Sequence, residues 1–417
     1  MENAESGLTP RALTRSSSMT SPGKQPSAAL SRFRVIDLSH VRSGPTCVKQ
    51  FADFGADVIK LESPATAAEE SGLGGTRDGY EMQNLHRNKR SLTLDLKRPE
   101  GREVFHLLVK TADVVVENYR PDVKARLGCD YATLKTVNPR IVLASISGFG
   151  QDGPYRDRPG MDQIAQGMSG LMSVTGFPDQ PPTRVGAAIV DVTAGLFAAL
   201  GVMTALLERE VSGEGQWVQS SLLQSGLALM DFQAARYLLA GEVGERVGND
   251  HPSIVPTSAY TTADGFLNVA TYGNEIWRRL CNAIGREELL EASEYATPSG
   301  RIAHRAAINA ALSDTFAIKD SSHWIAVLNK AGVPCGPIYA VDQVFADPQV
   351  RLLQQGAKVT HPRLGEIELV NQAVNLVRTP ASLVSATPDL GAHTDEVLAE
   401  LGLDSFRIAS LREMKVI

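Results

Sequence analysis

The feature that most constrains the fold is a repeated alternation of short apolar strands with helices, beginning at residue 33. Residues 34–38 are typical of a strand, a Ser-Gly-Pro turn at 43–45 leads into a helix ending near 54, and 56–61 predict a second strand. Pro45 suits a first helical turn, where its missing N–H needs no partner. Further strands are predicted at 91–96, 112–117 and 141–147, with a helix at 98–111. This alternation predicts an α/β fold with a doubly wound, Rossmann-like parallel sheet.

A second, smaller α+β domain is predicted at 241–335. Helices at 191–210 and 220–240 precede a change to Gly, Pro, Asn and His at 241–256, which suits a linker. Residues 259–270 are typical of a hairpin that turns at Asp264-Gly265, and helical segments follow at 274–284, 304–316 and 322–330. A chain of 417 residues is too long for one hydrophobic core, so more than one domain is expected. The large domain is assigned to residues 31–240, before the change of composition.

The first 30 residues are rich in Ser, Pro and Gly and predict a disordered tail, with translation beginning at Met1 or Met19. They contain no apolar core of a secretory signal, and the four cysteines are dispersed, so we expect a cytoplasmic protein. The longest apolar stretch, 192–207, is short and lies between Asp191 and Glu208, which favours a buried helix and no membrane partner.

Charge and motifs exclude several functions. The chain has 41 basic and 47 acidic residues, a net charge of −6, so no nucleic-acid partner is expected. No spacing of Cys or His indicates a metal site. Gly148, Gly150 and Gly153 form a GxGxxG pattern, but Pro154 and Pro159 prevent the helix that a dinucleotide pyrophosphate would need.

Asp162 follows a Pro-Gly turn and begins a Gly-rich helical segment. One interpretation is a helix N-cap, because aspartate accepts hydrogen bonds from exposed helix amides. The other is a nucleophile, since the neighbouring glycines would let a ligand approach a desolvated carboxylate. Position alone favours the N-cap and leaves both open.

The sequence resembles the class III coenzyme A transferases of the CaiB/BaiF type over about residues 33–403. The resemblance rests on separated blocks: RVIDLSHVRSGP with GADVIKLESP, NKRSLTLDLKRPEG, ADVVVENYRPDVKARLG, NPRIVLASISGFGQDGP, MDQIAQGMSGLM, VPCGPIYAVDQVFADPQ and LGAHTDEVLAELGL. The family also contains α-methylacyl-CoA racemases, but the segment from Asp162 to Gly170 follows the transferase pattern.

The resemblance implies covalent catalysis. Asp162 would attack an acyl-CoA thioester, pass through a mixed anhydride and an aspartyl-CoA thioester, and deliver CoA to a small carboxylic acid. No tightly bound cofactor and no metal is expected, with coenzyme A or acyl-CoA as substrate. Backbone amides near Gly148, Phe149 and Gly150 would stabilise developing oxyanions.

The resemblance also implies a set of CoA contacts, in which Lys97 and Arg126 are the cations for its phosphates. Taken singly, each of these charges would be interpreted as a solvated surface residue. The implied contacts are Val41, Arg42, Leu94, Lys97, Asn118, Tyr119, Arg126, Leu127, Ser147, Gly148, Phe149 and Gly150.

The sequence departs from the formyl-CoA transferase subgroup at Arg42, Ser147 and Phe149, where that subgroup has Gln, Lys and Tyr, and it lacks the subgroup's glycine-rich loop. These departures disfavour oxalate and formate. The planar fork of Arg42 predicts a short dicarboxylate such as succinate, malate, mesaconate or itaconate, although Arg42 would also suit a CoA phosphate.

The family fold implies that 336–417 return to the large domain, giving an open ring that interlocks with a second copy as a homodimer. Two alternatives remain: a racemase that uses Asp162 as a base, and a non-catalytic CoA-binding protein.

Overall fold

The computed structural model describes residues 24–64 and 75–417. Two compact units make up the chain: Met1–Ser145 with Ala198–Val218 and Gln355–Ile417, and Ile146–Phe197 with Gln219–Gln354. Residues 1–23 of the predicted tail lie outside the described residues. Within residues 24–30, Ser27 is buried and the Leu30 N–H donates to the Phe54 carbonyl at 2.9 Å. The domain boundaries at 240 and 335 stay a prediction.

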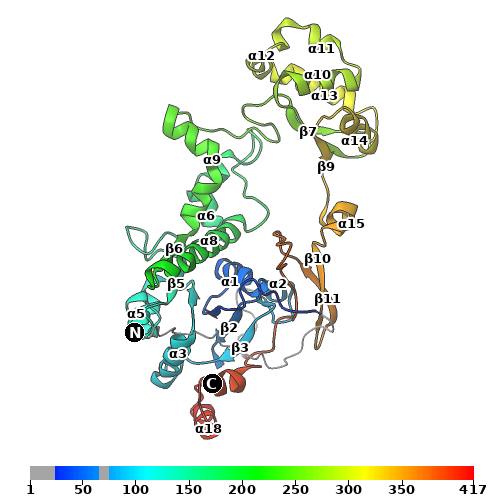
Figure 1. Ribbon diagram of the computed structural model, residues 1–417. Coiled ribbons are helices and arrows are strands. Elements are labelled where there is room, and N and C mark those ends of the chain that lie inside the picture. The colour runs from blue at the N-terminus through cyan, green and yellow to red at the C-terminus, as the bar shows by residue number, and fades with distance from the viewer. Residues whose placement is uncertain (1–23, 65–74) are drawn as a thin grey trace, which may run out of the picture. The chain divides into compact units, whose positions relative to one another are not determined.

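The first unit contains most of a six-stranded sheet with the order β3-β2-β1-β4-β5-β6 (Figure 1). β1 pairs in parallel with both β2 and β4, and the β2–β3 and β4–β5 pairs are parallel too. This confirms the predicted parallel α/β sheet. The strands are β1 Arg34–Asp37, β2 Asp57–Glu62, β3 Arg90–Thr93, β4 Val114–Glu117, β5 Val142–Ser147 and β6 Trp217–Ser221.

Helices cover this sheet and complete its core. Ile36, Val115 and Leu143 have no exposed surface and pack with Phe105 and Leu108 of α3. Strands covered on both faces become continuously apolar, which is why β4 consists of Val114 to Val116 before its terminal Glu117. The helices are α1 Ser43–Asp53, α2 Tyr80–His86, α3 Pro99–Thr111, α4 Pro121–Leu127 and α5 Tyr131–Val137.

Two long helices follow the parallel strands: α8 Ile189–Ser212 and α9 Leu222–Ala240. The prediction of a buried helix at 192–207 is only partly right. Val202 of α8 is buried, whereas Leu200 and Leu207 are exposed. By length and apolar composition α8 would be able to cross a membrane, as would many helices that pack inside a protein.

The last turn of α9 exposes Tyr237, Leu238 and Leu239. Adjacent exposed apolar side chains are typical of a surface that another chain covers. The interlocked homodimer stays a prediction.

Two short helices, α6 Asp162–Met168 and α7 Leu171–Val174, precede α8.

The predicted hairpin near Asp264 is confirmed in the second unit, where β7 pairs antiparallel with β8, and β9 joins them. Trp277, Phe316 and Trp324 build a separate core under this sheet. The elements are β7 Thr257–Thr261, β8 Phe266–Ala270, β9 Cys335–Pro337, α10 Gly273–Ile284, α11 Glu288–Glu291, the 3₁₀ helix Ser293–Tyr295, α12 Pro298–Ala303, α13 Arg305–Phe316, α14 Ser321–Lys330, α15 Val341–Ala346 and α16 Pro348–Leu352.

The C-terminal segment belongs to the first unit. It begins with an antiparallel hairpin, β10–β11, which was not predicted from the sequence, and two helices follow. These elements are β10 Gly356–His361, β11 Gly365–Val370, α17 Thr394–Glu400 and α18 Ser405–Glu413.

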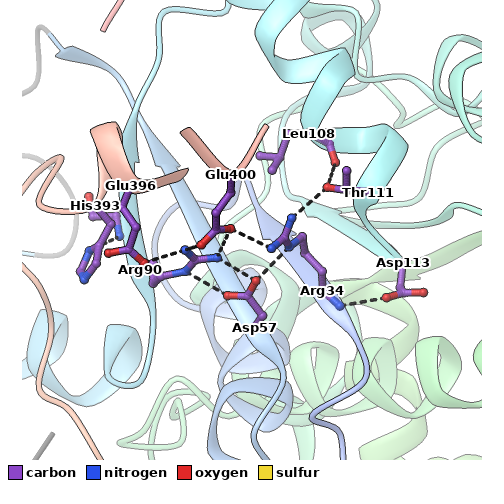
Figure 2. Close-up of polar contacts among 10 residues, drawn as sticks. Arg34, Asp57, Arg90, Leu108, Thr111, Asp113, His393, Glu396 and Glu400 are labelled. Atoms are coloured by element: carbon purple, nitrogen blue, oxygen red, sulfur yellow. Dashed lines mark hydrogen bonds and ion pairs between the residues drawn. The ribbon is translucent and has the colours of Figure 1, made fainter. Parts of the chain in front are cut away.

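An ion-pair network ties α17 to the amino-terminal edge of the sheet (Figure 2). Arg34, Asp57 and Arg90 are the first residues of β1, β2 and β3. Arg90 binds the Asp57 carboxylate with two nitrogens at 2.8 and 3.0 Å, and Arg34 Nε reaches it at 2.8 Å. From α17, Glu400 accepts from Arg34 at 2.9 Å and from Arg90 at 2.7 Å.

Burial opposes ionisation of Asp57, but Arg90 and Arg34 outweigh it and hold the Asp57 pKa below its ordinary value of 3.8. The folded chain therefore binds this proton more weakly than the unfolded chain does. The resulting stabilisation is complete above about pH 4 and is lost as the pH falls through the folded pKa.

We predict that Arg90→Met lowers the free energy of unfolding by about 3 kcal/mol near pH 7, because it leaves Asp57 and Glu400 short of a partner. The loss should shrink below pH 4 as Asp57 becomes protonated. Urea unfolding at both pH values measures it. The control is Arg278→Met, which breaks only an exposed pair with Glu275 and should change unfolding little. Equal effects of the two substitutions would contradict the role of the network.

Candidate active site

The order of the strands places a candidate binding site at the carboxyl ends of β1 and β4. The chain runs from β1 through β2 to β3 on one side of the sheet and from β4 to β5 on the other. Doubly wound sheets bind ligands where the order reverses, because the loops that follow the two central strands diverge there. Val41 and Arg42 follow β1, and Asn118 and Tyr119 follow β4. The structure thus brings these four predicted CoA residues to one edge of the sheet.

Asn118 joins the two loops directly. Its Oδ1 accepts from the His40 N–H at 2.8 Å, and its Nδ2 donates to the His40 carbonyl at 2.7 Å. Gly44 allows the first loop to fold back at this point, since a Cβ there would lie 2.2 Å from the Ser39 Cβ. The Asn118 side chain therefore fixes the geometry of the two loops, and both its carbonyl oxygen and its amide nitrogen are hydrogen-bonded to His40.

Arg42 has a backbone φ of 90°, a region that residues other than glycine seldom adopt. Its guanidinium forms an ion pair with Glu81 of α2. The Arg42 guanidinium, predicted to bind a substrate carboxylate, is thus already paired with a carboxylate of the protein. A substrate or phosphate that used Arg42 would have to replace Glu81.

The remaining predicted CoA residues of the first unit follow β3 or lie on α4. Leu94 directly follows β3 and is buried, whereas the Lys97 side chain is exposed. Arg126 and Leu127 end α4, and Arg126, with 72% of its side chain exposed, lies 3.5 Å from Asp122. An exposed pair of this kind contributes less than about 1 kcal/mol. The Arg126 guanidinium is therefore able to exchange Asp122 for a phosphate at low cost.

Asp162 is buried in the second unit and accepts hydrogen bonds on both oxygens. Oδ1 accepts from the backbone N–H groups of Val190 at 2.9 Å and Asp191 at 3.1 Å, in the first turn of α8. Oδ2 accepts from Gln166 Nε2 at 2.6 Å. The N-cap of α6 is Met161, so Asp162 does not cap its own helix and instead binds the amino-terminal end of α8. The carboxylate therefore faces the positive end of that helix dipole.

The loop after β5 packs against the loop that leads into Asp162. A Cβ on Gly160 would lie 2.6 Å from the Gly148 Cα, so both positions require glycine. Ser147, Gly148, Phe149 and Gly150 therefore adjoin the segment carrying the predicted nucleophile. The Gly150 N–H donates to Ser147 Oγ at 3.1 Å, which engages one of the three amides predicted to stabilise an oxyanion. No helix begins between β5 and α6, so the GxGxxG pattern has no dinucleotide geometry.

Comparison with known proteins identifies the family. Residues 30–394 match CoA-transferase family III. The chain belongs to the class III CoA-transferases.

Its relatives match over almost their whole length. It is 37% identical to a succinate--glutarate CoA-transferase of Agrobacterium fabrum, covering 91% of this chain and 97% of that protein. It is 35% identical to a formyl-CoA:oxalate CoA-transferase of Rhodopseudomonas palustris, covering 92% and 96%. Among solved structures, a CAIB/BAIF family protein from Brucella suis matches with a TM-score of 0.79 and 34% identity, covering 90% of this chain and 100% of that one.

Two residues that contact the predicted site residues of this class III CoA-transferase, Gln166 and Glu81, were not predicted from the sequence. Gln166 lies four residues after Asp162, the spacing at which two side chains meet on one helix face, so its contact with Asp162 was predictable. The Gln166 amide is oriented by the Val185 N–H, which donates to its Oε1 at 2.9 Å. Glu81 carried no signal, because its contact with Arg42 joins segments 39 residues apart.

Other reactive groups fit a catalytic role less well than Asp162. Burial raises the pKa of Cys281 to about 12 and the pKa values of Cys47 and Cys129 further, which keeps these thiols protonated. Within residues 24–64 and 75–417, no group of three His, Cys, Asp or Glu side chains is arranged to hold a metal ion.

We predict that Gly160→Ala separates the two loops beside Asp162 and lowers the free energy of unfolding by about 1 to 3 kcal/mol, because the new methyl group meets backbone. Thermal unfolding measures the effect. Gly265→Ala is the control, since a Cβ there meets nothing within 4 Å. If both variants melted alike, the close approach of Gly148 and Gly160 would not be a constraint.

Proposed function

We propose that this class III CoA-transferase moves CoA from an acyl-CoA thioester to a short dicarboxylate through a covalent intermediate on Asp162. The single observation that carries the proposal is the Asp162 carboxylate, buried but held ready by three hydrogen bonds. A carboxylate used only for capping would not need a side-chain amide aligned on its second oxygen.

The two oxygens suit different tasks. Oδ2 would attack the thioester carbonyl, and the C–S bond would break to release CoA thiolate and leave a mixed anhydride. The thiolate would then attack the aspartyl carbonyl and expel the acid as its carboxylate, which gives the aspartyl-CoA thioester. A second carboxylate would reverse these steps with a new acid.

The Val190 and Asp191 amides support this sequence. When the thiolate attacks the aspartyl carbonyl, negative charge gathers on Oδ1, which already lies 2.9 and 3.1 Å from these two donors. Donors at that distance stabilise an oxyanion without reorganising. We therefore assign them to the aspartyl oxyanion, alongside the Gly148 and Phe149 amides expected from the sequence.

The activities for which the relatives are named, on succinate, glutarate and oxalate, support a dicarboxylate substrate. Arg42 is our candidate for binding its second carboxylate, since the ion pair with Glu81 already has that chemistry. The relative that acts on oxalate places oxalate in the panel of acceptors to be tested, although Arg42, Ser147 and Phe149 disfavour it.

We predict that Asp162→Asn reduces transfer of labelled CoA by at least about a thousandfold, because an amide cannot form the anhydride. In the unaltered enzyme, hydroxylamine or borohydride added with acyl-CoA should modify Asp162, which peptide mass spectrometry measures. The control, Asp157→Asn, changes a carboxylate that is 79% exposed and should retain transfer. Acyl-CoA turnover without any adduct would indicate α-proton abstraction, and CoA binding without turnover would indicate a binding protein.

We predict that Arg42→Ala raises KM for the dicarboxylate acceptor about tenfold and leaves KM for acyl-CoA near its original value. Glu81→Gln, which removes the competing carboxylate, should lower the acceptor KM. Steady-state kinetics with succinate, malate, mesaconate, itaconate, glutarate and oxalate measure both. A rise confined to the acyl-CoA KM would assign Arg42 to CoA and overturn its role in acceptor binding.

A further inference from the structure

Both central strands end in a fully buried carboxylate. Asp37 is the last residue of β1 and Glu117 the last residue of β4, and neither side chain has exposed surface. The strands are parallel neighbours, with Asp37 opposite Val116. The two carboxylates therefore lie beneath the two loops of the candidate CoA site.

Asp37 holds the first loop. Its Oδ1 accepts from the Ser39 N–H at 2.9 Å and from the Ser39 hydroxyl. Its Oδ2 accepts from Lys89 Nζ at 2.8 Å. Lys60 Nζ donates to the Ser39 carbonyl at 2.9 Å, so every polar group of Ser39 is engaged from below. Val41 and Arg42 follow two and three residues later.

Glu117 holds the second loop in the same way. Its Oε2 accepts from the Tyr119 N–H at 2.8 Å, and its Oε1 accepts from Lys124 Nζ at 3.1 Å. Lys124 lies on α4, the helix that carries Arg126, and its ammonium also lies 4.9 Å from the Trp217 ring centroid. In both loops one carboxylate oxygen binds the N–H two residues later, and the other binds a buried lysine.

Stability alone does not account for two such pairs. Removing charges from water costs several kcal/mol per ion, and apolar side chains of similar volume are often as stabilising. Fixed buried charges do, however, define one geometry for the groups that they bind. Asn118 then joins the two loops through His40, so the four predicted CoA residues form one rigid edge.

Lys60 and Lys89 both lie close to Asp37, and Asp53 also acts electrostatically on Lys89, so several charges share this buried cluster. His86 Nδ1 lies 3.1 Å from Lys89 Nζ, and burial holds the His86 pKa well below its ordinary value, so this ring adds no charge at neutral pH.

We propose that the Asp37–Lys89 and Glu117–Lys124 pairs are positioning residues, which hold the loops after β1 and β4 in the geometry that binds CoA. This inference rests on the proposed function, because it assumes that these loops contact CoA. It predicts that loss of either carboxylate weakens CoA binding, and that loss of Asp37, whose loop also carries Arg42, weakens binding of the carboxylic acid as well.

The test compares Asp37→Asn and Glu117→Gln with Asp113→Asn. Asp113 binds Arg209 at 2.8 Å, but it directly precedes β4 and so lies at the opposite end of that strand from Glu117. Calorimetry gives Kd for CoA, and steady-state kinetics give KM for acyl-CoA and for succinate. We expect about tenfold increases in Kd and in the acyl-CoA KM for the two site variants, with kcat changed less than about threefold. The succinate KM should stay near its original value in Glu117→Gln and should rise in Asp37→Asn, because the loop that Asp37 holds also carries Arg42. Asp113→Asn should lower the melting temperature alone.

The outcomes separate the two proposals. If the unaltered protein neither binds nor transfers CoA, the proposed function fails. If it does both, and the two site variants bind CoA as tightly as Asp113→Asn does, the positioning role is overturned while the function stands. Should Asp37→Asn not fold, Ser39→Ala removes only the hydroxyl bond to Asp37, and an unchanged CoA Kd in that variant would also count against the proposal.

Discussion

The parallel pairing of β1 with β2 on one side and β4 on the other is the constraint on which the rest of the structure depends. It places the ends of the two central strands side by side and turns their following loops in opposite directions. At the amino-terminal edge the same pairing aligns Arg34, Asp57 and Arg90, and the two arginines bind Glu400 of α17. The sheet therefore separates an edge that anchors the C-terminal segment from an edge that carries the candidate CoA site.

Buried charge has a different role at each edge. Around Asp57, arginines and carboxylates satisfy one another across three strands and one helix, which secures chain segments about 300 residues apart. At the carboxyl edge, Asp37 and Glu117 bind the backbone of the loops themselves. Although the chain has a net charge of −6, lysines lie beneath these loops, and the proposed phosphate-binding residues Lys97 and Arg126 are exposed, one after β3 and the other on α4.

Asp162 combines the two interpretations that its position in the sequence left open. It does bind the amides of a helix, but the helix is α8 and not its own. The same amides that stabilise the carboxylate would stabilise the oxyanion of an aspartyl thioester. A capping interaction and a catalytic one therefore require the same geometry here, and a structural role at this position does not argue against a chemical one.

By itself, the sequence determined the parallel α/β sheet, the hairpin around Asp264, most of the long helices and the family. Each of these depends on local periodicity, turn residues or blocks of contiguous sequence. The β10–β11 hairpin and β6 were missed, because half-exposed strands with mixed polarity carry a weak signal. Only the tertiary structure decided that Asp162 binds α8, that Arg42 pairs with Glu81, and that Asp37 and Glu117 support adjacent loops. The first two contacts join residues 28 and 39 positions apart, and the two supported loops meet through His40 and Asn118, which are 78 positions apart. The folded backbone, not the spacing of residue types, sets which of many such pairs will meet.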